Sequence, residues 1–467
     1  MLLLDFFFDP EGLLSLRETT MRRIQTDLSC LLPSPAYTRM MLGLLCFAMS
    51  PTLTAEHHDL SPSSSPPLTL ETALHFALQD NPGLQEIKAR AEASTHVPSQ
   101  EGSLPDPELS FGALNLPSNT FNLHQEDMTM MAIGISQQLP FPGKLGLKEK
   151  ISSILSDIQA ATVEDARIQL ARNVKVAWWR IFYLDRAAEI VSQSQGSIEE
   201  VVKLAMASYR AGGSPQQDVL LAQMENSKYK ERRLEILNMR HIEAARLNAL
   251  LNLPGNRPVT LPHEGHIIKP EVKDDRVLFE TADAAQPRIT QKRKNIEAAQ
   301  SRLELAEKEF WPDLKFGTGY AFRQSTTAGT PRSDFVDFQL SINLPLYAAQ
   351  KQSKGVDQRQ SELLKEEFAL QDELRRLDAE ITESLVTYQH ANERFELYKS
   401  EIVPQAKQTV DVLLLSYRSG QTDMTSLLRA FTQLFEYEVL YWENLTQGQQ
   451  ALATLAAAIG EVPAHEQ

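Results

Sequence analysis

The chain has 467 residues, of which 42% are hydrophobic and 23% are charged. Its mean hydropathy of −0.30 makes it too polar for a bundle of membrane-spanning helices, whereas its apolar content is too high for a disordered chain. The 46 Lys and Arg residues against 61 Asp and Glu residues give a net charge of −15. This acidic balance argues against nucleic acid as a partner, because nucleic-acid-binding proteins usually carry a concentrated basic surface.

Residues 1–55 have the pattern of a signal-peptide region. The apolar run Met40–Met49 follows three arginines and is too short to span a bilayer as a helix. The segment SPTLTA follows it, so we expect cleavage after Ala55 and export of a bacterial protein. Residues 1–20 are acidic and fit no part of an export signal, which predicts that translation begins at Met21.

Both cysteines, Cys30 and Cys46, precede the expected cleavage site. Lipidation of Cys46 is not expected, because a lipoprotein signal needs a small residue before the cysteine and Leu45 stands there. The mature chain would then contain no cysteine, and neither a disulfide nor a cysteine-based zinc site is expected.

After a Ser/Pro-rich linker at residues 56–67, the chain carries a tandem duplication. Three motifs of the first half return in the same order in the second: Asn81-Pro82 as Gln286-Pro287, Ile135–Pro140 as Leu340–Pro345, and Ser208–Gly212 as Ser416–Gly420. A unit of roughly 200 residues is too long for a solenoid repeat. We expect a first repeat at residues 68–260, an inter-repeat linker at 261–274, a second repeat at 275–460 and a short tail at 461–467.

Each repeat contains two stretches in which apolar and polar residues alternate. They are regular at residues 314–323 and 336–344, and less regular at 109–113 and 131–139. A period of two over about 9–11 residues is typical of a membrane β-barrel strand. A half-buried strand of a soluble sandwich has the same alternation, but the strand length and the export signal together favour the membrane.

The remainder of each repeat is predicted to be helical. No proline interrupts residues 144–211, which predicts a helix on the order of 100 Å long. Between residues 350 and 419 the one proline is Pro404. Apolar residues recur there, and again after Gly420, at an average spacing of about 3.5, which specifies left-handed coiled-coil packing.

The number of predicted strands has a consequence for assembly. Four strands per chain cannot close a barrel, because small closed barrels need about eight. An open sheet edge in lipid would leave backbone groups without hydrogen-bond partners. The chain must therefore oligomerise to complete its sheet.

Several segments resemble the TolC family of outer-membrane factors: the helix start TLETALHFALQDNP, the strand-to-helix junction ISQQLPFPGK, and the paired hairpin tips SYRAG and SYRSG. The resemblance covers about residues 68–460 and implies a mixed α/β membrane protein in the outer membrane of a Gram-negative bacterium. It implies a homotrimer in which three chains contribute four transmembrane β-strands each to a 12-stranded barrel, with long coiled-coil α-helices forming a periplasmic tunnel. The implied partners are a periplasmic adaptor (membrane fusion) protein, an inner-membrane RND-type pump and outer-membrane lipid.

Within the family, three segments look like the branch paired with heavy-metal (cobalt-zinc-cadmium/copper) resistance pumps: LPDPEL at 104–109, NLP at 115–117 and QLPFPGK at 138–144. The resemblance therefore implies a passive exit duct for heavy-metal cations. A multidrug efflux or type I secretion channel is the alternative within the family. A soluble periplasmic coiled-coil scaffold is the alternative from another class.

The resemblance places a periplasmic gate at the hairpin tips. Tyr417 and Gly420 match the family's tip tyrosine and glycine, and Tyr209 and Gly212 are their first-repeat counterparts. Glycine at a tip supplies the positive φ that a reversal between helices needs, so a plain helix C-cap explains the glycines as well.

Family members often constrict the pore with acidic rings just past the tip. Ser426 and Arg429 occupy those positions here, so a ring-type cation site is not expected. Asp218 and Asp423 lie nearby in the sequence. They either supply negative charge at the mouth of the pore or are solvated aspartates on a helix face.

No catalytic, cofactor or metal site is expected. His124 with Met128, Met130 and Met131 presents ligand types that suit soft metal ions, but methionine in such a segment is more often packing. The EHHD segment at 56–59 has the composition of a polar tail.

The enzyme motifs that come closest are all incomplete. His263 and His266 lack the spacing of a zinc protease, and Gly143-Lys144 lacks the glycine of a phosphate loop. The sequence GISQQ at 134–138 breaks the pattern of a nucleophile elbow. The sequence therefore predicts a protein that is not an enzyme.

Overall fold

The computed structural model describes residues 67–263 and 275–461. The expected signal-peptide region with its two cysteines, the EHHD segment, His266 and nearly all of the predicted linkers and tail lie outside the described residues.

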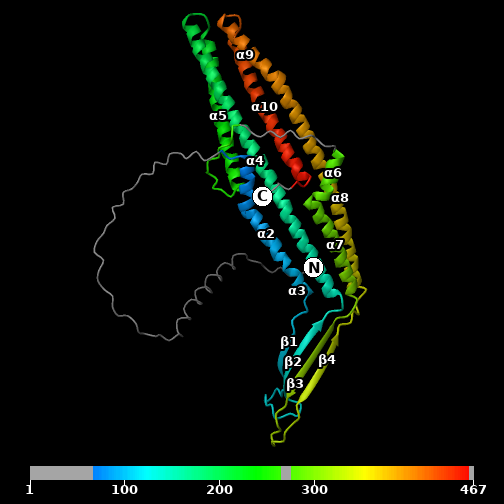
Figure 1. Ribbon diagram of the computed structural model, residues 1–467. Coiled ribbons are helices and arrows are strands. Elements are labelled where there is room, and N and C mark those ends of the chain that lie inside the picture. The colour runs from blue at the N-terminus through cyan, green and yellow to red at the C-terminus, as the bar shows by residue number, and fades with distance from the viewer. Residues whose placement is uncertain (1–66, 264–274, 462–467) are drawn as a thin grey trace, which may run out of the picture. The chain divides into compact units, whose positions relative to one another are not determined.

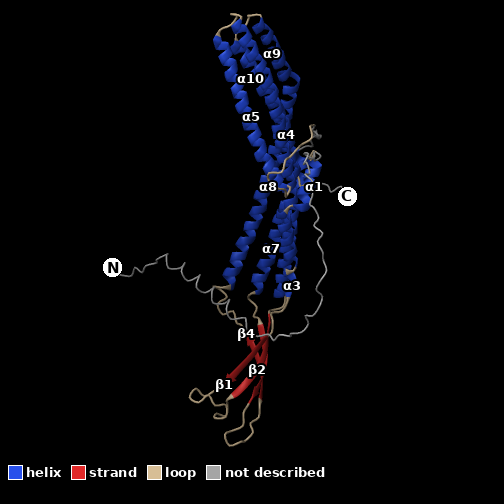
Figure 2. Ribbon diagram, turned by 90° about the vertical axis from the view of Figure 1, so that its left-hand side faces the viewer, coloured by secondary structure: helices blue, strands red, loops and turns tan. Residues whose placement is uncertain are grey.

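Helices, two strands and then a long helical hairpin follow one another twice along the chain. The first half contains α1 (Leu70–Asp80), α2 (Pro82–Thr95), α3 (Val97–Gly102), β1 (Glu108–Leu114), β2 (Met130–Leu139), α4 (Lys144–Arg210) and α5 (Gln216–Leu250). The second half contains α6 (Asp275–Ala285), α7 (Pro287–Lys308), β3 (Leu314–Phe322), β4 (Phe335–Ile342), α8 (Gln352–Leu397), the π-helical turn η1 (Tyr398–Ile402), α9 (Val403–Arg418) and α10 (Met424–Ala458). Figures 1 and 2 show the strands at one end of the helices and the turns of the α4–α5 and α9–α10 hairpins at the other.

The long helices form where the sequence predicts them, with one local difference. Helix α4 is continuous over 67 residues, or about 100 Å at the α-helical rise. In the second half, a continuous helix was expected across residues 350–419, but η1 interrupts it directly before α9. Pro404 has no N–H to donate, and in η1 the Val403 N–H bonds to the Tyr398 carbonyl, five residues back instead of four.

The two halves are anchored in the same way near their first proline. Pro82 and Pro287 each stand at the start of a helix, where the missing N–H costs nothing. The Asn81 side-chain amide donates to the Leu250 carbonyl at 3.0 Å, and the Gln286 amide donates to the Ala457 and Ala458 carbonyls at 3.0 Å. Each break between short helices is therefore tied to the end of the last long helix of its own half.

The strands form one antiparallel sheet in the order β1-β2-β3-β4. The central pair, β2 with β3, joins the two halves, from Met131 opposite Phe322 to Leu139 opposite Leu314. Large apolar side chains that alternate along the strands share one face and are exposed: Leu109, Phe111, Met131, Ile133, Ile135, Phe316, Tyr320, Phe322, Val336, Phe338, Leu340 and Ile342. Phe338 is 86% exposed, so this face has no covering layer within the described residues.

The core lies along α4, which packs against α5 on one side and α10 on another. Near the middle of α4, Trp178 stacks on Phe182 with ring centroids 5.6 Å apart, and Trp442 of α10 meets Phe182 edge-on at 5.9 Å. The Trp178 indole N–H donates to the Leu68 carbonyl at 3.0 Å, which satisfies its polar group inside the core. Among the described residues, no helix combines the length and the apolar character needed to cross a membrane.

A buried ion pair connects the sheet to the helices. Lys144, at the start of α4, is 4% exposed, and its ammonium lies 2.9 Å from Asp313, the residue before β3. The same ammonium donates to the Trp311 carbonyl at 3.0 Å, and the Phe141 N–H donates to Asp313 at 2.8 Å. The Phe141 and Trp311 rings stack beside this pair, 5.1 Å apart.

The environment of Asp313 stabilises its charged form. Burial opposes ionisation, but hydrogen bonds from Lys144 and from the Phe141 N–H outweigh it and hold the pKa of Asp313 below its ordinary value. A lowered pKa in the folded state stabilises the fold above the unfolded pKa of the group, and this contribution is lost as the pH falls through the folded pKa.

We expect Lys144→Met to lower the free energy of unfolding by about 3 kcal/mol, because it leaves the Asp313 carboxylate partly buried without its counter-ion. Thermal unfolding followed by far-UV circular dichroism in detergent measures the change. The deficit should shrink at acidic pH, where Asp313 is protonated in both proteins.

Lys150→Met is the matched control, since Lys150 lies on the same helix and is exposed. Equal unfolding temperatures for the Lys144→Met and Lys150→Met proteins would show that the ion pair does not hold the junction together.

Candidate functional site: the hairpin tips

Both hairpins reverse through the same backbone conformation. Gly212 has a φ of +74° and Gly420 a φ of +73°, a region that only glycine adopts without strain. The next N–H in each tip bonds back to a serine carbonyl, Gly213 to Ser208 at 2.9 Å and Gln421 to Ser416 at 2.8 Å. The SYRAG and SYRSG motifs therefore form equivalent helix ends.

Tyr417 connects the two hairpins. It is 8% exposed, and its hydroxyl donates to Asp218 Oδ2 at 3.0 Å. Asp218 lies in the first turn of α5, where the positive end of the helix dipole favours a carboxylate. One hydrogen bond to a charged acceptor thus joins the end of α9 to the start of α5.

This hydrogen bond is present at neutral pH. Burial, and after it the Asp218 carboxylate, raise the pKa of Tyr417 to about 12. Because an unfolded tyrosine ionises near pH 10, the stabilising effect is complete below about pH 10 and is lost as the pH rises through the folded value.

Tyr209, the first-half counterpart, has a different environment. It is 46% exposed, and no hydrogen bond within residues 67–263 or 275–461 reaches its hydroxyl. Equivalent positions in the two tips therefore share a backbone but not a side-chain contact.

The remaining predicted tip residues lie at the start of α10. Asp423 caps this helix, accepting hydrogen bonds from the Ser426 N–H at 2.8 Å and from the Ser426 hydroxyl at 2.9 Å. These two donors lower the pKa of Asp423. Ser426 is half-buried, and Arg429 is exposed one turn further along α10.

A second polar contact between the hairpins lies one level below the tips. The Thr432 hydroxyl of α10 donates to Glu225 of α5 at 3.2 Å, and Lys228 lies 3.0 Å from Glu225. Tyr229 meets Phe435 edge-on at 5.3 Å, and burial raises the pKa of its hydroxyl. The sequence pattern did not predict the contact between Thr432 and Glu225, although it places a polar residue on the apolar stripe of each of the two helices.

The histidine and methionine residues of the first hairpin loop do not converge. His124 Nδ1 lies 2.8 Å from the Ser325 carbonyl. Met130 is buried, whereas Met128 and Met131 are exposed, and Met130 and Met131 point to opposite faces of β2 because strand side chains alternate. Within the described ranges, no group of three or more His, Cys, Asp or Glu residues could hold a metal ion.

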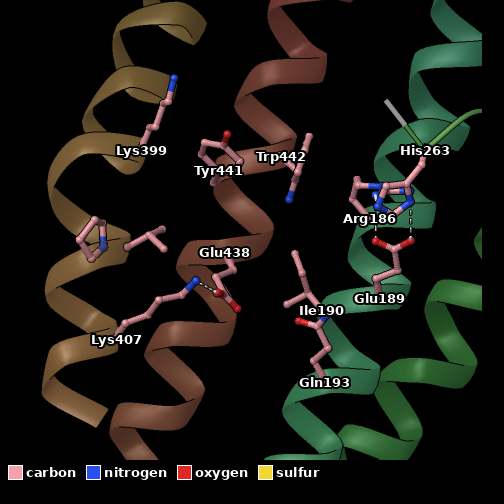
Figure 3. A pocket seen from close by; sticks show the side chains of 12 residues that line it. Arg186, Glu189, Ile190, Gln193, His263, Lys399, Lys407, Glu438, Tyr441 and Trp442 are labelled. Atoms are coloured by element: carbon pink, nitrogen blue, oxygen red, sulfur yellow. Dashed lines mark hydrogen bonds and ion pairs between the residues drawn. The ribbon is translucent and has the colours of Figure 1, made fainter. Parts of the chain in front are cut away.

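A hollow of about 590 Å³ lies alongside α4, α9 and α10, with His263 at its rim (Figure 3). Arg186 contacts both ring nitrogens of His263, at 3.0 and 3.2 Å, and lies 3.0 Å from Glu189. Across the hollow, Lys407 pairs with Glu438 at 2.9 Å. The charged side chains that line the hollow are largely neutralised in pairs. Among these lining residues, no nucleophile has an adjacent base.

The geometry of a four-stranded sheet, two long hairpins and paired tips agrees with the family comparison. Residues 73–253 and 278–461 match the family described as outer membrane efflux protein. The chain belongs to this family. It is an outer-membrane channel of a tripartite efflux system, with its helices in the periplasm, and not an enzyme.

Solved structures show the same fold at low sequence identity. The outer membrane protein VceC from Vibrio cholerae is 18% identical, with a TM-score of 0.71 over 84% of this chain and 96% of that chain. The CmeC outer membrane channel of Campylobacter jejuni is 13% identical, with a TM-score of 0.70 over 92% and 95%. CusC is 15% identical, with a TM-score of 0.71 over 84% and 92%. Comparison with curated proteins finds no match to this chain.

We expect Tyr417→Phe to raise single-channel conductance in planar bilayers and the leakage of large antibiotics into cells. The substitution keeps the ring and removes the hydrogen bond to Asp218. Loss of about 1.5 kcal/mol from a closed state shifts the closed-to-open ratio roughly tenfold. Tyr417→Ala, which also removes packing, should have a larger effect.

Tyr209→Phe is the matched control, because it removes the same hydroxyl from the tip that lacks the hydrogen bond. A trimeric Tyr417→Phe protein whose conductance equals that of Tyr209→Phe would leave Tyr417 as ordinary interhelical packing.

Proposed function

We propose that the chain forms a homotrimer in which three sheets close into one 12-stranded barrel. The observation that carries this proposal is the sheet itself, with one exposed apolar face and with β1 and β4 each paired on one side only. In lipid, the free edges need partners, and the β1 and β4 edges of neighbouring copies supply them. The exposed apolar face also disfavours a soluble scaffold, because it would lie open to water.

The trimer then acts as a passive exit duct. The helices of the three chains form a periplasmic tunnel that meets a periplasmic adaptor protein and an inner-membrane RND-type pump, and the pump supplies the energy. Tyr209, Gly212, Asp218, Tyr417, Gly420, Asp423, Ser426 and Arg429 form the region of the gate, which the adaptor and pump loosen. The Tyr417–Asp218 hydrogen bond supports this role, because it closes two hairpins against each other at the end farthest from the sheet.

Heavy-metal cations are the cargo we propose, with drugs or secreted polypeptides as the alternative within the family. The support is the resemblance of LPDPEL, NLP and QLPFPGK to the heavy-metal branch. QLPFPGK contains Phe141 and Lys144, the residues of the sheet-to-helix junction. This segment therefore distinguishes family branches by the structure of the junction between the strands and the helices, and it does not contact the cargo in this proposal.

The assembly is tested by crosslinking and by light scattering of the detergent-solubilised protein. We expect one species with three times the mass of the mature chain. A stable dimer or a monomer with intact strands would contradict the trimer.

The cargo is tested by deleting the gene and measuring survival. We expect greater sensitivity to divalent metal ions than to dyes and detergents, and restoration by the intact gene. Sensitivity to dyes and detergents alone would assign the channel to multidrug efflux.

A further inference from the structure

The polar face of the sheet carries few charged side chains. On this face lie Glu108, Ser110 and Gly112 of β1, Ala132, Gly134, Ser136 and Gln138 of β2, Lys315, Gly317, Gly319 and Ala321 of β3, and Asp337, Gln339 and Ser341 of β4. In a membrane barrel the apolar face contacts lipid, so the opposite face lines the lumen. Glu108, Lys315 and Asp337 are the three ionisable residues of the strands on this face.

Two of the three charges neutralise each other. The Lys315 ammonium lies 2.6 Å from the Glu108 carboxylate, across the intervening strand β2. Among the described residues, no ion pair or hydrogen bond engages the carboxylate of Asp337, which is exposed. Within the four strands themselves, this leaves the polar face with a net charge of one negative unit per chain, and Asp337 supplies it.

The neighbours of Asp337 leave its carboxylate accessible. In the register of the sheet, Asp337 lies opposite Gly319, Gly319 opposite Gly134, and Gly134 opposite Ser110. A Cβ atom added at Gly319 would lie 2.5 Å from Asp337 Oδ1, so the carboxylate rests above a residue without a side chain. The surrounding hollow, of about 200 Å³, is lined by Asp337, Gly134 and Ser110 of this row, by Lys315, and by polar neighbours that include Ser136 and Gln339.

We propose that Asp337 sets the preference of the barrel lumen for cations. The inference rests on the proposed trimer, in which three copies of Asp337 lie at one level of the pore wall. Rings of acidic side chains favour cations in aqueous pores. Since Asp423 caps α10 and Asp218 accepts the Tyr417 hydroxyl, the tip carboxylates are engaged while Asp337 is not.

The test is the reversal potential of purified protein in planar bilayers across a gradient of KCl. Wild-type protein should prefer K⁺ to Cl⁻, and Asp337→Asn should lower the permeability ratio by about twofold or more. Asp337→Lys should turn the preference towards Cl⁻, and Asp337→Glu should retain it. Each variant is measured alone and in combination with Tyr417→Phe. The combination ensures that a constriction at the tips does not hide the contribution of the barrel to the permeability ratio.

The matched control is the double variant Glu108→Gln with Lys315→Gln. It removes one charge of each sign from the same face, and the permeability ratio should stay at the wild-type value. Pores with an unchanged ratio in Asp337→Asn would overturn the role of Asp337 but leave the channel intact. Absence of any pore from trimeric wild-type protein would overturn the proposed exit duct as well.

Discussion

The backbone groups along the free edges of β1 and β4 set the constraint on which the rest of this structure depends. In the described sheet, β1 and β4 each have one hydrogen-bonded neighbour. An unpaired N–H or C=O in hydrocarbon costs several kcal/mol. Helices satisfy their own backbone hydrogen bonds, so in the proposed trimer it is the sheet that needs other copies of the chain. The junction formed by Lys144, Asp313, Phe141 and Trp311 then carries the geometry of the strands to the helices. The Lys144–Asp313 pair joins α4 of the first half to the start of β3 in the second. The helices of the first half and the strands of the second half are therefore coupled at this junction.

Much of this fold can be predicted from local patterns. The alternation at residues 314–323 and 336–344 locates β3 and β4 to within two residues, since a period of two is specific to strands. The absence of proline likewise predicts α4 as one helix. The turn η1 could not be predicted. Pro404 removes one helical hydrogen bond, but its presence in the sequence does not determine whether the helix kinks or accommodates an extra residue in a π-helical turn. The pairing of β2 with β3 was also not predicted, since alternation specifies faces and not neighbours.

The two tips show why the candidate site could be predicted only in part. The duplicated SYRAG and SYRSG motifs identify both turns, because a positive φ at Gly212 and Gly420 is a local requirement. Which tyrosine makes a hydrogen bond depends on a residue 199 positions away, namely Asp218 for Tyr417. No local pattern contains that contact, and the exposed Tyr209 looks the same in the sequence. The two tips thus share a backbone conformation, whereas their tyrosines make different side-chain contacts.

The aspartates near the two tips extend this divergence to charge. Asp218 and Asp423 both lie at the start of the helix that follows a tip, where the helix dipole stabilises a carboxylate. One accepts a hydrogen bond from Tyr417 and the other accepts two from Ser426, so both carboxylates are used to hold structure. Arg429 adds a positive charge one turn further along α10. Both carboxylates stay negatively charged while they accept these hydrogen bonds, and Arg429 offsets one of the two charges. The polar face of the sheet, where Glu108 and Lys315 cancel and Asp337 does not, is therefore a second part of the proposed pore wall where a preference for cations can arise.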